Sequence, residues 1–408
     1  MTVKLSFIQE QLTKCLLILF LLFPFKGQII KLALIFLILI LSTISKTICL
    51  SKKCILWNVS FVIFNGFYLL LGFLRNNPAT GHYVPTYILW PILFAFLSGT
   101  IGNRAIQNYI DIIKTCLFLN IIFGIISFIF FNITLQPDGS LLGFKAGIRP
   151  GFPFIVISSP IITDFLFWFF FFFTLYFIIK THFALKKILF LILGIIFIFA
   201  TSRRVLFINF GISIFLLALL KKYIPDNKSV INQRIVKSIL GISIFIIFCF
   251  SILVGNGMME STSLSDFLEK TSEASDEPRI IQTKSLIDGW LNYPLFGAGP
   301  GIDAGISRSE IPGTYELSYL AKLFEVGFFG MLVYVIFWSL LFYWTFKTIS
   351  NKSINPNYVI ALLSAMSIFL IGNATNPYLG AFDYMWFMYT PFVAINLSEK
   401  NKVRYVHS

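Results

Sequence analysis

The chain has 408 residues, of which 57% are hydrophobic and only 12% are charged. Because a soluble domain carries about 25% charged residues, this composition excludes a soluble globular protein and predicts one that crosses a membrane many times. The net charge of +14 does not indicate a nucleic-acid partner, since no basic face with base-stacking aromatic residues accompanies it. The five cysteines have no Cys-x-x-Cys spacing, so neither a zinc site nor a disulfide framework is predicted.

Apolar runs of roughly 20 residues, the length of a bilayer-spanning helix, recur along the chain. They predict an all-α polytopic integral membrane protein with about twelve spans, at residues 7–25, 29–45, 54–74, 83–101, 109–133, 158–179, 186–201, 204–220, 236–256, 326–346, 357–373 and 379–397. Lys4 and Lys14 precede the first run without a small-residue cleavage site, so a first span is predicted and not a cleaved signal peptide. Pro24, Lys26 and Lys31 interrupt the first two runs, which predicts either a re-entrant pair or two short helices.

Positive charge orients these predicted spans. With the N-terminus in the cytoplasm, most Lys and Arg residues of the short loops, such as Lys52, Lys53, Lys186 and Lys187, fall on the cytoplasmic side. Both termini are then cytoplasmic. The predicted domains are a bundle of about nine spans at 1–256, a large extracytoplasmic loop with short helices at 257–325, and the last three spans with a cytoplasmic tail at 326–408.

The predicted large loop is polar over residues 257–316 and holds more than half of the 18 acidic residues of the chain. Loops of this length are usually functional or disordered. Asp276 as an N-cap and Pro278 in the first turn predict that a helix begins there. An apolar stripe continues that helix and predicts that it lies on the membrane: Ile280, Ile281, Ile287, Trp290 and Leu291.

Several arginines are predicted on the outer side, against the inside bias. Arg203 and Arg204 fall in a tight turn between two spans, and Arg279 opens the loop helix. Lys145 and Arg149 fall in a second external loop at 134–157. Guanidinium groups bind phosphate oxygens bidentately and stay charged when buried, so this group predicts a site for an anionic, lipid-linked ligand.

Simpler interpretations of these charges stay open. Arginines at helix ends can be snorkelling anchors, and Arg279 can pair with Asp276 or Glu277. Asp164 and Asp383 also fall near outer helix ends and are candidate partners of the outer arginines.

The most distinctive motif is the glycine-rich segment Asn292-Tyr-Pro-Leu-Phe-Gly-Ala-Gly-Pro-Gly301. It is not a dinucleotide-binding fingerprint, because no βαβ unit surrounds it. Residues of this segment and its surroundings match in order and spacing the pattern of one membrane-protein family: Ser202-Arg203, Arg279, Pro294–Gly301, Tyr319-Leu320, Leu323, Glu325, Gly327 and Gly330. In these residues the chain resembles the O-antigen polymerase (Wzy-type) and O-antigen ligase superfamily.

The resemblance implies a membrane glycosyltransferase. Such enzymes move glycan from an undecaprenyl-diphosphate donor to a sugar hydroxyl, at the outer face of the bacterial cytoplasmic membrane, without a metal or cofactor. Arg203, Arg204 and Arg279 would stabilise the departing diphosphate. Lys145, Arg149, Tyr315, Gly297 and Gly299 would contact the diphosphate or the glycan.

Glu316 separates the two branches of the resemblance. It stands where ligases carry a histidine, which favours a polymerase of O-antigen, capsule or exopolysaccharide repeats, with Glu316 as the general base. A carboxylate that satisfies the dipole at a helix N-terminus is the plainer interpretation. An O-antigen ligase of lipopolysaccharide assembly is the alternative, and a polysaccharide flippase is a further one, although no half-on-half repeat supports a transporter. The implied partners are the lipid-linked oligosaccharide, a chain-length regulator and a flippase.

Overall fold

The computed structural model describes residues 2–102, 105–136, 139–141, 143–148, 154–159, 161–178, 185–201, 204–220, 279–305, 315–351, 354–374 and 376–406. The predicted span at 236–256, the loop residues 257–278 with Asp276 and Pro278, and Arg149 and Arg203 lie outside this part of the chain.

The first third of the chain is helical. The helices are α1 (Thr2–Leu22), α2 (Gln28–Ile44), α3 (Lys52–Leu74), α4 (Thr80–Val84), α5 (Trp90–Gly99) and α6 (Ile106–Thr134). Ser51 caps α3 by accepting a hydrogen bond from the amide of Cys54 at 3.1 Å. A π-helical turn at Pro85–Leu89 joins α4 to α5, and in it the amide of Trp90 bonds to the carbonyl of Pro85. The widened turn follows from Pro85, which has no amide to donate to the preceding turn.

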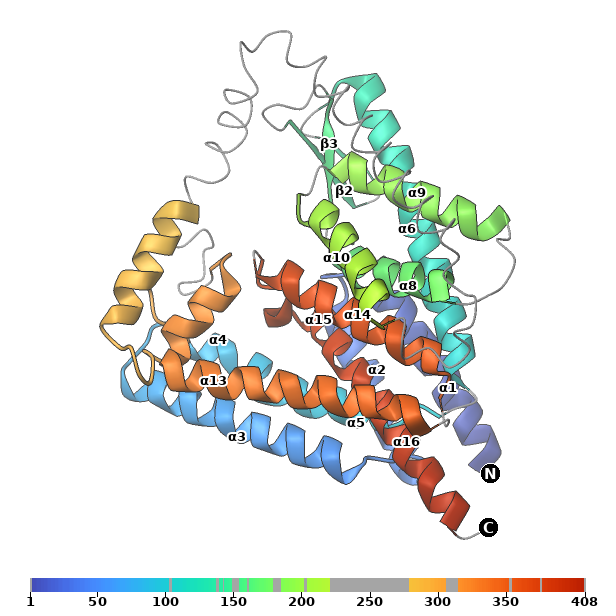
Figure 1. The fold of residues 1–408 in the computed structure, drawn as a ribbon, viewed down its shortest axis with the longest axis horizontal. Coiled ribbons are helices and arrows are strands. Elements are labelled where there is room, and N and C mark those ends of the chain that lie inside the picture. Colours follow the sequence, from blue (N-terminus) through green and yellow to red (C-terminus); the bar gives the residue numbers. More distant parts are fainter. Residues whose placement is uncertain are drawn as a thin grey trace.

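A small antiparallel sheet follows, in the order β1 (Ser140–Leu141), β2 (Phe144–Gly147) and β3 (Val156–Ser158). Lys145 pairs with Ser140 and Ser158 in its register. No strand is predicted from the sequence there, because the runs are too short to show alternation. In Figure 1 strands β2 and β3 lie beside α6 and α9 (Leu185–Thr201).

The remaining helices are α7 (Ile162–Asp164), a π-helical turn at Phe165–Phe169, α8 (Phe170–Ile178), α10 (Arg204–Leu220), a helix at 279–291, α13 (Ser318–Lys347), α14 (Pro356–Asn373), α15 (Phe382–Met385) and α16 (Thr390–Val406). Short 3-10 turns lie at Thr348–Asn351, Tyr378–Gly380 and Trp386–Tyr389. Figure 1 shows α3 and α13 running alongside each other, and the helix at 279–291 at one end of that pair.

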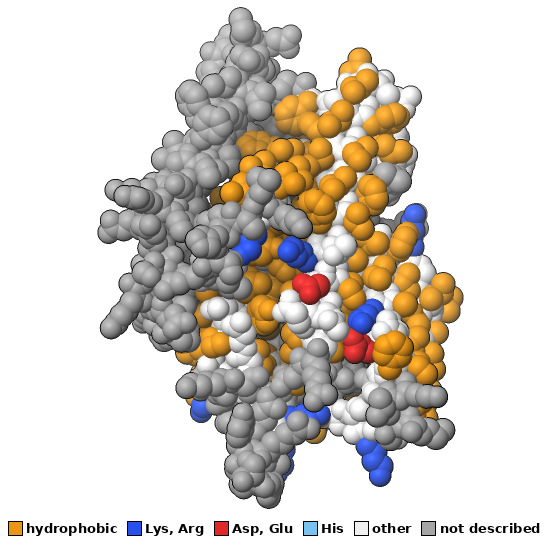
Figure 2. Space-filling view, turned by 90° about the vertical axis from the view of Figure 1, so that its right-hand side faces the viewer, with side chains coloured by type: hydrophobic (Ala, Val, Ile, Leu, Met, Phe, Trp, Pro, Cys, Tyr) orange, Lys and Arg blue, Asp and Glu red, His pale blue; other side chains and the backbone are white. Residues whose placement is uncertain are grey.

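The described helices are those of a membrane protein. Among them, 5 are long and apolar enough to cross a bilayer; the total of about twelve spans and the position of the large loop stay predictions. Leu56, Ile63 and Leu74 on α3 are 64%, 67% and 72% exposed, and the described part of the face seen in Figure 2 is mostly hydrophobic with few charged side chains. Apolar surface of this extent is covered by lipid and not by water.

The interior is aromatic. The phenylalanine run that opens at Phe165 is buried, and the rings of Phe165 and Phe169 stack with centroids 4.3 Å apart. Gly194 of α9 permits this packing, because a Cβ there would overlap the ring of Phe169. These phenylalanines therefore pack inside the protein and do not face lipid.

A buried ion pair ties the N-terminal helices to the C-terminal ones. Lys31 of α2 contacts Asp383 of α15, and both side chains are fully buried. Asp383 also accepts from the amide of Phe25 at 3.1 Å, and Lys31 donates to the carbonyl of Phe23 at 2.7 Å. This pair thus fixes the connection between α1 and α2. Among the described residues, the ion-pair partner of Asp383 is Lys31; Arg149, Arg203 and the side chain of Arg204, which the sequence also suggests as partners, fall outside them.

Candidate functional site

A cavity of about 580 Å³ opens among α4, α5, α13 and the loop before α15. Its lining residues come from distant parts of the chain: Phe25, His82, Tyr83, Thr86, Tyr87, Trp90, Tyr315, Ser318, Tyr319, Ala321, Lys322, Glu325, Tyr334, Asn373, Pro377, Leu379, Gly380 and Ala381. Many of them are aromatic, with a small number of polar groups. The size lies within the roughly 300–1,000 Å³ of small-molecule sites, which share this composition.

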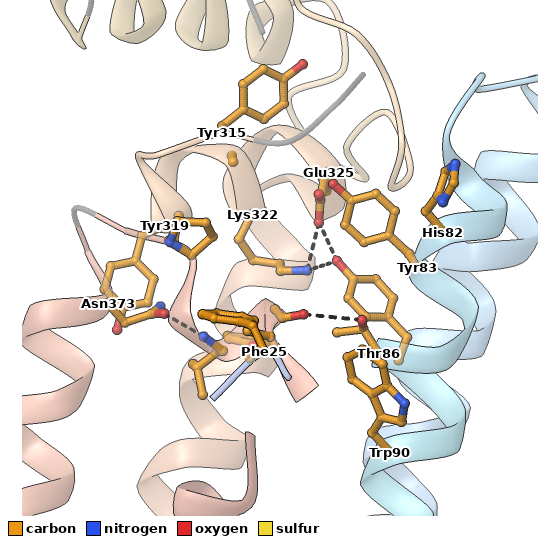
Figure 3. Close-up of a pocket in the computed structure, with 18 residues that line it drawn as sticks. Phe25, His82, Tyr83, Thr86, Trp90, Tyr315, Tyr319, Lys322, Glu325 and Asn373 are labelled. Carbon is orange, nitrogen blue, oxygen red and sulfur yellow. Dashed lines mark hydrogen bonds and ion pairs between the residues drawn. The ribbon is translucent and has the colours of Figure 1, made fainter. Parts of the chain in front are cut away.

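Two opposite charges meet in the cavity. Lys322 and Glu325 lie three residues apart and therefore on one face of α13, and Lys322 Nζ is 2.7 Å from Glu325 Oε2. Tyr87 donates to the same carboxylate oxygen at 2.6 Å and accepts from Lys322. Figure 3 shows Lys322 extending across the cavity, opposite the helix that carries Tyr83, Thr86 and Trp90. The π-helical turn thus supplies Tyr87 to an ion pair on α13.

A break in α13 positions this pair. Gly327 has φ 67° and ψ −175° inside the helix, so the amides of Phe328 and Phe329 cannot bond to the carbonyls four residues earlier. They donate instead to the carbonyls of Pro294 and Leu295, at 2.8 and 3.1 Å. The carbonyls that they leave, of Phe324 and Glu325, accept from the amides of Ala298 and Gly299, each at 2.8 Å. The two amides and the two carbonyls that the break separates are therefore all bonded.

The segment at residues 294–301, called here the glycine turn, is in turn held by the residues after α3. Asn77 donates to the carbonyls of Ala298, Gly299 and Pro300 at 3.0, 3.2 and 3.1 Å. Arg75 donates to the carbonyl of Gly297 and lies 4.4 Å from the ring centroid of Tyr293. The glycine turn therefore packs between α3 and the break in α13, and it fixes the backbone of Glu325.

Positive φ makes glycine necessary in this turn. Gly299 has φ 84°, and a Cβ there would lie 2.7 Å from both Cα and N of Gly72. The structure gives Gly297 and Gly299 this packing role, and neither lines the cavity. Their predicted contact with substrate stays a prediction.

The two predicted catalytic residues contact each other. Arg279 Nε lies 3.1 Å from Glu316 Oε2, and their side chains are 34% and 27% exposed. Gln282, one turn into the same helix, accepts from the amides of Glu316 and Leu317 at 3.0 and 3.2 Å. These contacts dock the helix at 279–291 on the residues that lead into α13, beside the cavity.

Tyr315, the neighbour of Glu316, lines the cavity and is only 3% exposed. Its hydroxyl donates to the carbonyl of Ile302 at 2.9 Å and accepts from the amide of Ala304 at 2.6 Å. Burial raises the pKa of the Tyr315 phenol to about 12. This side chain therefore connects the cavity wall to the residues after the glycine turn.

The other predicted site residues are not brought to the cavity in the described part of the chain. Lys145 is exposed on β2 and does not line the cavity. Arg204 is the first residue of α10, but its side chain is not among the parts that the structure describes, and neither are Arg149 and Arg203. Of the predicted set, the structure therefore brings together Arg279, Glu316 and Tyr315.

Comparison with known proteins identifies the segment that builds one wall of this cavity. Residues 188–335 match the family described as O-antigen ligase. This match supports the resemblance of the chain to the superfamily of O-antigen ligases and polymerases. No curated protein matches the chain. The matched segment contains Tyr315, Lys322 and Glu325, whereas Tyr87 and Trp90 come from outside it. The match to this family implies an enzyme of the membrane glycosyltransferase type.

Lys322 and Tyr87 are the residues of the cavity that sequence reasoning missed. A signal for Lys322 was present, because an ionisable residue in an apolar helix is a functional candidate by default. Tyr87 carried no such signal, since tyrosine is common in membrane helices and the turn at Pro85 alone brings it to Glu325.

Proposed function

We propose that this protein is a polysaccharide polymerase, which joins oligosaccharide repeats carried on undecaprenyl diphosphate at the outer face of the bacterial cytoplasmic membrane. The observation that carries the proposal is the match of residues 188–335 to the O-antigen ligase family. The repeats would be those of an O-antigen, a capsule or an exopolysaccharide.

The reaction is a glycosyl transfer. The oxygen of an acceptor hydroxyl attacks the anomeric carbon of the donor sugar, the bond from that carbon to the diphosphate oxygen breaks, and the lipid diphosphate leaves with the electron pair. Cations that are already in place stabilise the charge that develops on the leaving group. Arg279 takes this role, together with Arg203 and Arg204.

The proton of the acceptor hydroxyl goes to the carboxylate of Glu316. The 3.1 Å contact between Arg279 and Glu316 supports a shared site for these two roles. A phosphate oxygen that competes for Arg279 would leave the carboxylate of Glu316 to accept the proton.

Glu316 also favours a polymerase over a ligase. It stands at the position where the resemblance puts the histidine of ligases, and the three histidines of the chain fall elsewhere. A ligase that transfers the finished glycan to another acceptor is the second candidate, because the family match is to the O-antigen ligase family.

The test is deletion of the gene in the native host, with surface polysaccharide resolved by size. We expect a single-repeat product, restored to a ladder by the wild type. Arg279→Ala should fail to restore the ladder, because loss of one such electrostatic group costs about 10²–10³ in rate. Lys284→Ala is the matched control, since Lys284 is an exposed cation on the same helix.

The other outcomes separate the alternatives. Polymer that forms but stays on its lipid carrier identifies a ligase. Repeats retained on the cytoplasmic side identify a transporter. An unchanged ladder after deletion contradicts all three.

A further inference from the structure

The charges that line the cavity cancel. Among the described lining residues, Lys322 is the one Lys or Arg and Glu325 is the one Asp or Glu, and they are bonded at 2.7 Å with side chains 13% and 6% exposed. An anion that entered would meet an ammonium already neutralised by a carboxylate, and it would lose its own hydration. This arrangement disfavours a diphosphate or a uronic acid at this place and suits an uncharged ligand.

The same pair retains unused bonding capacity. An ammonium has three donors, and Lys322 uses two of them, on Glu325 and Tyr87, within the described part of the chain. Both of those bonds to Glu325 reach Oε2, while Oε1 accepts none from the described residues. The cavity therefore presents a donor beside an acceptor, which is what two neighbouring hydroxyl groups require.

Aromatic rings surround this donor and acceptor. Tyr83, Trp90 and Tyr319 line the cavity with their side chains partly exposed, and Figure 3 shows Tyr83 and Trp90 on one side and Tyr319 on the other. Aromatic faces offer large apolar area to the C–H faces of a ring, and the polar tips of tyrosine add hydrogen bonds. A sugar-like ring fits both features, because its apolar faces pack on the aromatic rings and its hydroxyl groups bond to the donor and the acceptor.

We propose that the Lys322–Glu325 pair and these rings form a subsite for an uncharged pyranose. One sugar hydroxyl donates to Glu325, and a neighbouring one accepts from Lys322. This inference rests on the proposed function, of which it names the substrate class: at this position the glycan carries a neutral sugar, while the diphosphate lies outside the cavity, toward Arg279.

The test is direct binding to the purified full-length protein in detergent micelles, measured by saturation-transfer NMR. The probes are a panel of uncharged methyl glycosides that differ in hydroxyl configuration, with methyl glucuronide and inorganic pyrophosphate as the anions. We expect transfer to at least one uncharged glycoside, with discrimination between epimers, and no displacement by pyrophosphate.

The binding variant is the double substitution Lys322→Met with Glu325→Gln, which removes both charges and so leaves no unpaired one buried. It should weaken binding of the glycoside at least about tenfold, because bonds to charged groups are the strong ones. Lys284→Met is the matched control and should bind as the wild type does. A thermal unfolding curve establishes that the double variant is folded.

Two results would overturn the proposal. One is binding of pyrophosphate or glucuronide that the double variant abolishes, which would make the cavity an anion site. The other is a folded wild-type protein that binds none of the uncharged glycosides. Because binding needs no turnover, either result is distinct from failure of the polymerase assay, in which the surface ladder is read.

Discussion

Replacement of Gly299 by alanine tests whether the glycine turn serves packing or substrate. The added Cβ would lie 2.7 Å from Cα and N of Gly72 and 3.2 Å from Nδ2 of Asn77. Backbone cannot move aside as a flexible side chain can, so α3 and the turn must separate. Gly305→Ala is the matched control, because Gly305 has a similar φ of 81° against 84° and no atom within 4 Å of its added Cβ.

The two variants differ by the overlap alone. A residue other than glycine in the left-handed region costs about 1–2 kcal/mol, and this cost is common to both. The gain of about 0.4–1 kcal/mol from a stiffer unfolded chain is common as well. Forcing an extra carbon into a packed site costs about 1–3 kcal/mol further. We therefore expect Gly299→Ala to be less stable than Gly305→Ala by about 1–3 kcal/mol.

The assay is equilibrium unfolding of both variants in detergent micelles, followed by tryptophan fluorescence, alongside restoration of the polysaccharide ladder. Because the glycine turn fixes the backbone of Glu325, lost stability and lost ladder should go together for Gly299→Ala. A Gly299→Ala protein as stable as the control, but inactive, would refute the packing role and favour direct contact of Gly299 with substrate.

Two further predictions follow from buried groups. Asp383→Asn should lower the free energy of unfolding by about 3–5 kcal/mol, since it leaves Lys31 charged and unpaired. The double variant Lys31→Met with Asp383→Leu should leave the free energy of unfolding nearly unchanged. Equal losses of stability for the single and double variants in denaturant would contradict this. Burial raises the pKa of Tyr315 from 10.0 to about 12, because the folded state favours the neutral phenol. The resulting contribution to stability is fully present below pH 10 and is lost as the pH rises toward 12. Tyr315→Phe should therefore show a shallower loss of stability over that window, and an unaltered slope would count against it.

Within the described residues, hydropathy predicted the positions of several helices closely, because the thickness of a bilayer sets the length of an apolar run. The expected run at 204–220 has the bounds of α10, and the run at 357–373 differs from α14 by one residue at its start. The span expected to begin at residue 326 belongs to a helix that begins at Ser318. The charges of Lys322 and Glu325 lower the hydropathy of the residues before 326, so hydropathy does not extend the span to them. Pairing inside the fold makes those charges tolerable, and pairing is invisible to hydropathy.

Contacts between distant residues account for most of what the sequence could not predict. Lys31 looked like an interruption of a span, yet it is the partner of Asp383, more than three hundred residues away. Glu316 and Arg279 were predicted separately on motif position, and only the structure shows that they contact each other. Glu325 was matched to a family pattern, but its bond to Tyr87 depends on the π-helical turn at Pro85.

The break in α13 has a consequence for biogenesis. Carbonyls at a helix break inside an apolar layer need partners, because lipid supplies none. Here the partners are the amides of Ala298 and Gly299, and the turn that presents them is held by Asn77. The glycine turn that bonds to α13 is therefore held by Asn77, which lies between α3 and α4 and is translated much earlier than α13. A fragment that lacks its first hundred residues would lack the Asn77 contacts that hold the glycine turn at the break in α13.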